Sequence, residues 1–162
     1  MSDILSLCAS MPEQKFAAGE VLLREGENSG MLYVLIEGAV EVLKGEVQIN
    51  MVSDAGALFG EMSVLLEAPH MATVRALEPS RCYVIKDAAG FLQSDTAVGL
   101  HVSRLLARRL HSVITYLADL KRQFEDHDDH LGIVDEVLET LVHHQGEEHV
   151  PGSDRDPDPN VY

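Results

Sequence analysis

Two short groups of residues in the middle of the chain could hold a small ligand. Gly60 has no Cβ, so a ligand can approach the backbone there closely. Glu61 offers a carboxylate that accepts hydrogen bonds from hydroxyl groups. A short helix starting near Met62 would point free N–H groups at an anion. His70 follows Pro69 and carries an imidazole that is mostly neutral at pH 7.

Composition excludes several classes of function. The 162 residues have a net charge of −15, which repels phosphate backbones and argues against DNA binding. No apolar run approaches the roughly 20 residues that a membrane span needs. The N-terminus has no basic region and carries Asp3, so it does not read as a signal peptide. We therefore expect a cytoplasmic protein without a membrane partner.

Metal and catalytic sites find little support in the sequence. Cys8 and Cys82 are isolated, so no thiolate metal site or redox pair is indicated. A metal site inside a β-barrel needs several histidines, and His70 stands alone before residue 100. Histidines 143, 144 and 149 could bind a metal, although a solvated tail is the simpler interpretation. No nucleophile lies near a base at motif spacing, so we predict a non-enzyme with no catalytic residue and no cofactor.

The elements that position the central stretch are short strands separated by glycines. Such spacing is typical of a compact antiparallel barrel or sandwich. Gly45 lies in an expected hairpin turn. Val40, Val42, Val47 and Ile49 alternate with Glu41, Leu43, Gln48 and Asn50, as expected for paired, half-buried strands. The expected strands are residues 20–24, 31–36, 39–43, 47–52, 73–77 and 81–85.

Both ends of the chain differ from this β region. Residues 3–11 predict a short helix with Asp3 as its N-cap. From residue 106 to residue 141 apolar residues recur at alternating steps of four and three, which predicts an unbroken heptad seam. A straight helix of that length would be about 54 Å long, too long to bury on a small barrel, so we expect a parallel homodimer through residues 106–141. Residues 146–162 predict a disordered acidic tail.

A folded-back helical hairpin is the alternative to this rod. His127 interrupts the seam, and Asp128-Asp129 followed by Gly132 could end one helix and begin another. Residues 101–122 hold five Lys/Arg and one Asp, whereas residues 124–154 hold ten Asp/Glu and no Lys/Arg, which favours an antiparallel or folded-back pairing.

The chain resembles cyclic-nucleotide-binding domains of the catabolite-activator/FNR (Crp/Fnr) type over roughly residues 10–125. The resemblance rests on four groups of residues in the family's order: 16–20 with 24–27, 32–38 with 40–42, 59–62, and 69–74. It implies a mainly β fold with helices: a jelly-roll (double-stranded β-helix) with a short N-terminal helix and a long C-terminal dimerisation helix. It also identifies residues 59–76 as the phosphate-binding cassette, hereafter the cassette.

The resemblance assigns the ligand-binding role to two ends of the cassette. Glu61 would bind a ribose 2′-hydroxyl, while His70 occupies the position where the family places an arginine that clamps the cyclic phosphate. Imidazole cannot reproduce the guanidinium fork, and Met71 adds bulk where a small residue is usual. Arg75 is two pleats from the expected site, and the base-contacting positions of the long helix hold Val113 and Ile114. The candidate ligand-binding residues are Phe59, Gly60, Glu61, Met62, His70, Met71, Ala72 and Thr73.

Two functional hypotheses follow. The first is a regulatory module, with residues 1–93 as the β-roll, 94–145 as a long helix or coiled coil and 146–162 as the tail. It would bind a cyclic nucleotide or related anion and signal through its helix to a protein partner. The second is a degenerate domain without a ligand that acts as a dimeric interaction module. Only about 20 residues follow the seam, so no helix-turn-helix is expected.

Overall fold

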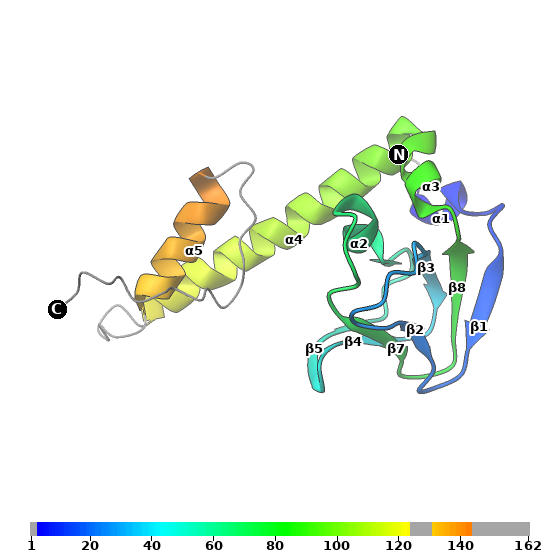
Figure 1. Cartoon of the computed structure of the whole chain (residues 1–162), viewed down its shortest axis with the longest axis horizontal. Helices are drawn as coiled ribbons and strands as arrows, with labels where there is room; N and C mark the ends of the chain where they lie inside the picture. Colours follow the sequence, from blue (N-terminus) through cyan, green and yellow to red (C-terminus); the bar gives the residue numbers. More distant parts are fainter. Residues whose placement is uncertain (1–2, 124–130, 144–162) are drawn as a thin grey trace. The chain divides into compact units, whose positions relative to one another are not determined.

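The computed structural model describes residues 3–123 and 131–143 (Figure 1). The chain divides into two compact units, residues 1–105 and 106–162. The first unit contains two four-stranded antiparallel sheets. One sheet has the order β1 (Glu13–Phe16), β8 (Ser80–Ile85), β3 (Leu32–Glu37), β6 (Leu58–Phe59). The other has the order β2 (Val21–Leu23), β7 (Thr73–Ala76), β4 (Val40–Lys44), β5 (Val47–Val52).

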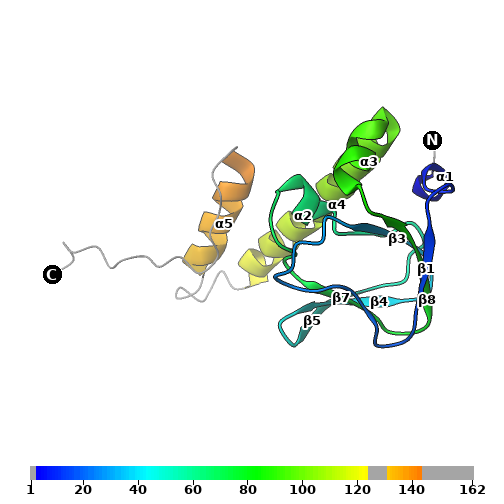
Figure 2. The same ribbon diagram turned by 45° about the vertical axis from the view of Figure 1, so that its right-hand side comes forward.

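The two sheets face each other and enclose the core (Figure 2). Alternate residues of each strand point inward because successive side chains leave a strand on opposite faces. In β7, Val74 and Ala76 are buried while Thr73 and Arg75 are half-buried. The rings of Phe16 and Tyr33 meet edge to face with centroids 5.7 Å apart. The predicted jelly-roll is confirmed.

Two strands were not predicted, and one strand was predicted with the wrong environment. β1 and β6 carry no clear alternation over their short lengths, so the sequence pattern missed them. The β4–β5 hairpin forms at Gly45 as expected, but Val47 and Ile49 are 66% and 59% exposed rather than half-buried. β5 is the last strand of its sheet, and only β4 pairs with it.

Four helices begin in the first unit. α1 (Ile4–Leu7) starts after Asp3, as predicted, but it ends at Leu7 and not at residue 11, and the Asp3 side chain makes no capping hydrogen bond. α2 (Glu61–Leu65) is a single turn inside the cassette. α3 (Ala88–Ser94) is capped by the Asp87 carboxylate, which accepts from the Gly90 N–H at 3.0 Å. α4 (Thr96–Gln123) buries Val98 and Val102 near its start, and the first unit ends inside it, at Leu105.

The second unit contains the remainder of α4 and α5 (Leu131–His143). Lys121 of α4 forms an ion pair with Asp135 of α5. In one straight helix these residues would be about 21 Å apart, far beyond side-chain reach. The predicted unbroken rod over residues 106–141 is therefore wrong, and the folded-back alternative is the arrangement in the structure. The charge separation along the seam supplies the reason, since it brings a basic segment against an acidic one.

Several sequence predictions fall outside the described residues. These include the interruption at His127, the turn at Asp128-Asp129 and the acidic tail over residues 146–162. The domain boundaries at residues 93 and 145 stay predictions. Within residues 3–123 and 131–143, no group of three His, Cys, Asp or Glu side chains is arranged to hold a metal ion. No helix in the described parts of the chain has the length and apolarity to cross a membrane.

Candidate ligand-binding site

The cassette begins where β6 turns into α2, and Gly60 makes that turn. Its φ is 99°, a conformation that L side chains rarely adopt. A Cβ at this position would collide with the carbonyl oxygen of Met31, while Leu23 Cδ1 would lie 3.3 Å away. Glycine is thus required by the close approach of Met31, the residue directly before β3, whether or not a ligand binds.

Glu61 follows as the first residue of α2 and is only 3% exposed. The Ser63 hydroxyl in the same turn donates to the Gly60 carbonyl at 3.0 Å. Every buried side-chain oxygen and nitrogen in the described residues has a hydrogen-bond partner, so this carboxylate is both buried and satisfied. Phe59 is buried in the core, whereas Met62 is 38% exposed. The first four predicted site residues thus lie on one continuous turn, with Glu61 as its buried charge.

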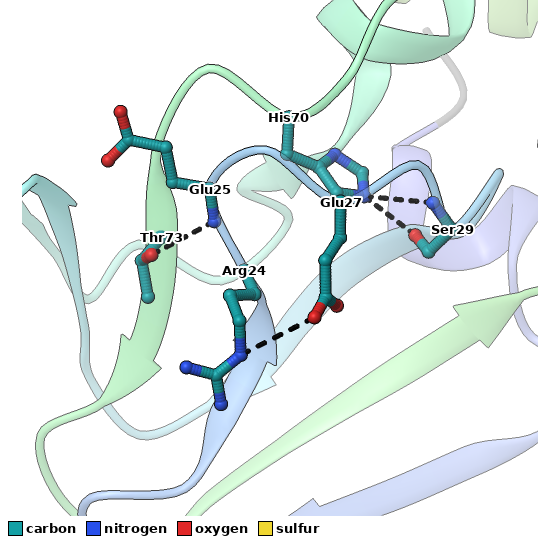
Figure 3. Close-up of polar contacts among 6 residues, drawn as sticks. All are labelled: Arg24, Glu25, Glu27, Ser29, His70 and Thr73. Carbon is teal, nitrogen blue, oxygen red and sulfur yellow. Dashed lines mark hydrogen bonds and ion pairs between the residues drawn. The ribbon is translucent and has the colours of Figure 1, made fainter.

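His70 lies at the other end of the cassette and is fastened to the segment between β2 and β3. Its N–H donates to the Glu27 carbonyl and its carbonyl accepts from the Gly26 N–H, both at 2.8 Å. Its Nε2 lies 2.7 Å from Ser29 Oγ and 3.4 Å from the Ser29 backbone nitrogen (Figure 3). The Ser29 hydroxyl in turn accepts from the Met31 N–H at 3.2 Å. The residue at the position where the family places an arginine is thus a buried histidine whose ring is hydrogen-bonded to Ser29.

The bonding of His70 sets its protonation state. A backbone N–H can only donate, so Nε2 accepts from Ser29 and the ring proton resides on Nδ1. Burial lowers the pKa of His70 below its usual value of 6.5, while the carboxylate of Glu27 acts in the opposite direction. The imidazole is therefore neutral at pH 7 and supplies no positive charge to the phosphate end of the cassette.

The rest of the cassette leads into β7. Met71 is 52% exposed, and its carbonyl accepts a hydrogen bond from Lys44 Nζ at 2.7 Å. Thr73 Oγ1 accepts a hydrogen bond from the Glu25 N–H at 3.0 Å. Ala72, between Met71 and Thr73 in the sequence, is half-buried. These bonds fasten the cassette to β4 and to the segment after β2.

Lys44 is a cation beside the cassette that the sequence analysis did not single out. Its Nζ also lies 2.6 Å from Glu25 Oε1. Lys44 and the Gly45 N–H, which donates to the same carboxylate, lower the pKa of Glu25. Lys44 and Met71 are 27 positions apart, and the antiparallel register between β4 and β7 brings them together. Linear spacing therefore offers no signal for this contact, nor for the one between Ser29 and His70.

Arg75, the other cation near the cassette in sequence, is held elsewhere. Its Nη2 lies 2.6 Å and its Nε 2.7 Å from Glu41 Oε1, and Gln48 donates to the second oxygen at 2.8 Å. This arrangement lowers the pKa of Glu41, chiefly through the hydrogen bond from Arg75. Arg75 is engaged within the β2–β7–β4–β5 sheet, consistent with the expectation that it does not replace the missing clamp.

The positions expected to contact a base belong to the second unit. Val113 is 49% exposed and Ile114 is half-buried. The Thr115 hydroxyl donates within α4 to the His111 carbonyl at 2.9 Å. The structure thus unites the two ends of the cassette in one unit, and the base-contacting positions stay a prediction.

Comparison with known proteins places this geometry in context. The family model described as "Cyclic nucleotide-binding domain" matches residues 13–93. A cAMP-dependent protein kinase regulatory subunit from Blastocladiella emersonii is 30% identical over 143 residues, covering 85% of this chain and 33% of that protein. The cGMP-dependent protein kinase, isozyme 1, of Drosophila melanogaster is 31% identical over 140 residues, covering 85% of this chain and 17% of that protein.

Solved structures share the fold. The catabolite activator protein of Thermus thermophilus superposes with a TM-score of 0.62 at 21% identity, covering 74% of this chain and 63% of that one. At this identity the likeness concerns the fold alone. The chain spans between 17% and 33% of the length of three curated relatives that it matches.

Proposed function

The chain belongs to the family of cyclic nucleotide-binding domains, and on that basis we propose that it is a non-enzymatic regulatory module whose cassette binds a cyclic nucleotide or a related small anion. The two curated relatives named above are, by name, a regulatory subunit of a cAMP-dependent protein kinase and a cGMP-dependent protein kinase. The signal here would pass through the C-terminal helices to a protein partner. A cytoplasmic location stays a prediction from the sequence.

The observation that carries this proposal is the first turn of the cassette. Its informative residue is Glu61, a buried carboxylate at the start of α2, since packing against Met31 already requires glycine at position 60. Burying a charged group is costly unless it is bonded, so an ionisable carboxylate at this position has a specific polar role. A ribose hydroxyl is a suitable partner for it when a nucleotide is present.

The phosphate end of the cassette predicts weak binding at neutral pH. His70 is neutral and bonded to Ser29, and Lys44 is paired with Glu25. Losing one charge-assisted hydrogen bond costs about 1.5–3 kcal/mol, which corresponds to roughly ten- to hundredfold in affinity. We therefore expect dissociation constants well above those of a cassette with an arginine clamp.

Titration calorimetry with cyclic AMP and cyclic GMP tests this proposal. The expected result is weak, saturable binding that is abolished in Glu61→Ala and tightened in His70→Arg. The absence of both heat and a melting shift at millimolar nucleotide, in the wild type and in His70→Arg, would reject nucleotide binding.

A degenerate interaction module is the second candidate, and the structure of the His70 side chain favours it. The His70 ring is hydrogen-bonded to Ser29 in the segment after β2, so His70 has a structural role in the domain without any ligand. The net charge of −15 suits a basic protein partner. Nucleotide binding by the wild type would reject this second candidate and support the first.

Homodimerisation is retained as a proposal, now resting on the exposed residues of α4. Leu110, Val113 and Tyr116 are 43%, 49% and 64% exposed. They recur at helical spacing and form an apolar stripe that a second copy could cover. A solution mass equal to one chain across a wide concentration range would reject the dimer.

A further inference from the structure

His70 joins two segments that lie far apart in the sequence. Its main chain forms a pair of 2.8 Å hydrogen bonds with Gly26 and Glu27, and its ring reaches Ser29. Figure 3 shows the ring turned toward Ser29, with Glu27 beside it. The ring contact is the one of these bonds that depends on protonation, because Nε2 must carry a lone pair to accept from the Ser29 N–H.

The charged groups near His70 come from the segment after β2 and from β4. Glu27 follows β2 and pairs with Arg24 at 3.6 Å across a solvent-exposed contact. Glu25 pairs with Lys44 from β4, whose ammonium also reaches the Met71 carbonyl. Arg24 and Lys44 are thus already paired, and the carboxylate of Glu27 would favour a positive charge on the ring.

We propose that His70 is an acid-operated latch: in its neutral form it ties the cassette to residues 26–29, and protonation breaks the hydrogen bond from the Ser29 N–H and places a cation at the phosphate end of the cassette. This inference rests on the proposed nucleotide-binding function. It gives that site a regulation by pH, with tighter binding of anionic nucleotides in acid.

Each half of the proposal follows from ring chemistry. The imidazolium has two N–H donors and no acceptor, so the amide of Ser29 loses its partner, and Nε2–H can donate to the Ser29 hydroxyl or to a ligand oxyanion. Burial disfavours that charge, which keeps the latch closed at neutral pH. A bound cyclic phosphodiester stays anionic throughout this range and would stabilise the imidazolium by a charge-assisted hydrogen bond.

Calorimetric titration of the full chain with cyclic AMP at about pH 7.5 and about pH 5.5 tests the coupling, since these values bracket the reference pKa of histidine. We expect the wild-type affinity to rise about ten- to hundredfold at the lower pH. His70→Gln, which keeps a hydrogen-bonding side chain without a titratable ring, should bind weakly at both values. His70→Arg should bind tightly at both. Equal pH responses of the wild type and His70→Gln would overturn the proposal.

Proton NMR of the ligand-free chain separates this inference from the proposed function. The imidazole resonance lost in His70→Gln should titrate below the reference pKa, and the Ser29 amide should shift with the same midpoint. If nucleotide binds without pH dependence, the latch fails and the proposed function stands. If the latch titrates and no nucleotide binds at either pH, the coupling and the proposed function both fail. If the Ser29 amide does not follow the ring, the latch itself is rejected.

Discussion

Ser29 Oγ lies 2.7 Å from Nε2 of His70, across 41 positions of sequence. The residue in the expected arginine position therefore bonds to a neighbouring segment of its own domain. Since the same hydroxyl accepts from Met31, which leads into β3, this contact connects the cassette to the strand beside Gly60. The two ends of the cassette are thus linked through residues 29–31.

Removing the Ser29 hydroxyl tests the structural value of that contact. We expect Ser29→Ala to lower the free energy of unfolding by about 1 kcal/mol, because the hydroxyl bonds to both His70 and Met31. Urea unfolding measures the change. Ser53→Ala, at an exposed position, is the matched control and should change stability little. Equal effects of the two substitutions would show that the contact has no stabilising role.

The stability of the domain should fall as the pH drops through the histidine range. The pKa of His70 is lowered in the folded state, so the unfolded chain takes up its proton first. The contribution is complete above the unfolded pKa of about 6.5 and is lost as the pH falls toward the folded value. The slope from this one group is at most about 1.4 kcal/mol per pH unit.

Urea unfolding at several pH values measures this slope, and His70→Gln should flatten it. The pKa values of Glu25 and Glu41 are also lowered, from 4.5, so their contributions are lost only in more acidic solution. A wild-type slope that survives in His70→Gln would assign the effect to other histidines.

Gly60→Ala should destabilise the domain more than Gly19→Ala, which has comparable backbone strain and no steric clash. The new Cβ would meet the Met31 carbonyl as well as the strain of a positive φ. We expect a loss of more than about 3 kcal/mol. Gly19 has a φ of 86° with nothing within 4 Å, so Gly19→Ala isolates the backbone strain at about 1–2 kcal/mol. Thermal unfolding of both variants gives the comparison, and equal losses would contradict the close approach.

The β5 edge should promote aggregation. Val47, Ile49 and Met51 are each at least 59% exposed, and residues 47–52 contain no charged side chain to block pairing with another strand. Ile49→Lys should reduce light scattering at high concentration and leave the melting temperature unchanged. Gln48→Lys adds the same charge without removing the apolar side chain, and it should help less. Equal improvement in both variants would attribute the effect to charge alone.

Cross-linking distinguishes the folded-back helices from a straight coiled coil. In Lys121→Cys/Asp135→Cys, a thiol-reactive cross-linker about as long as a lysine side chain should join the two residues within one chain, because the native residues are paired. A straight parallel coiled coil would instead join residue 121 of two chains. Gel electrophoresis without reductant separates these products, and each single variant provides the control. Cys8 and Cys82 are buried, so they should not compete.

The sequence predicted those features of the fold that depend on local pattern. Alternation and glycine spacing located six of the strands to within a residue or two at each end, and four groups of residues in the family's order, two of them before the cassette, identified the family. The sequence pattern did not predict β1, with four residues, or β6, with two, because such strands are too short to show a period. The exposure of Val47 and Ile49 was not predicted either, since alternation does not reveal whether a strand lies at the edge of a sheet.

The sequence by itself determined that His70 stands where an arginine is expected and that Gly60 and Glu61 precede it. Only the tertiary structure decided what those residues contact. Antiparallel pairing brings residues 26–29 beside His70 and Lys44 beside Met71, and desolvation in that packed setting keeps the imidazole neutral. Heptad periodicity likewise fitted both a rod and a hairpin. The pairing of Lys121 with Asp135 selected the hairpin, because a contact between distant residues depends on how the chain folds back on itself.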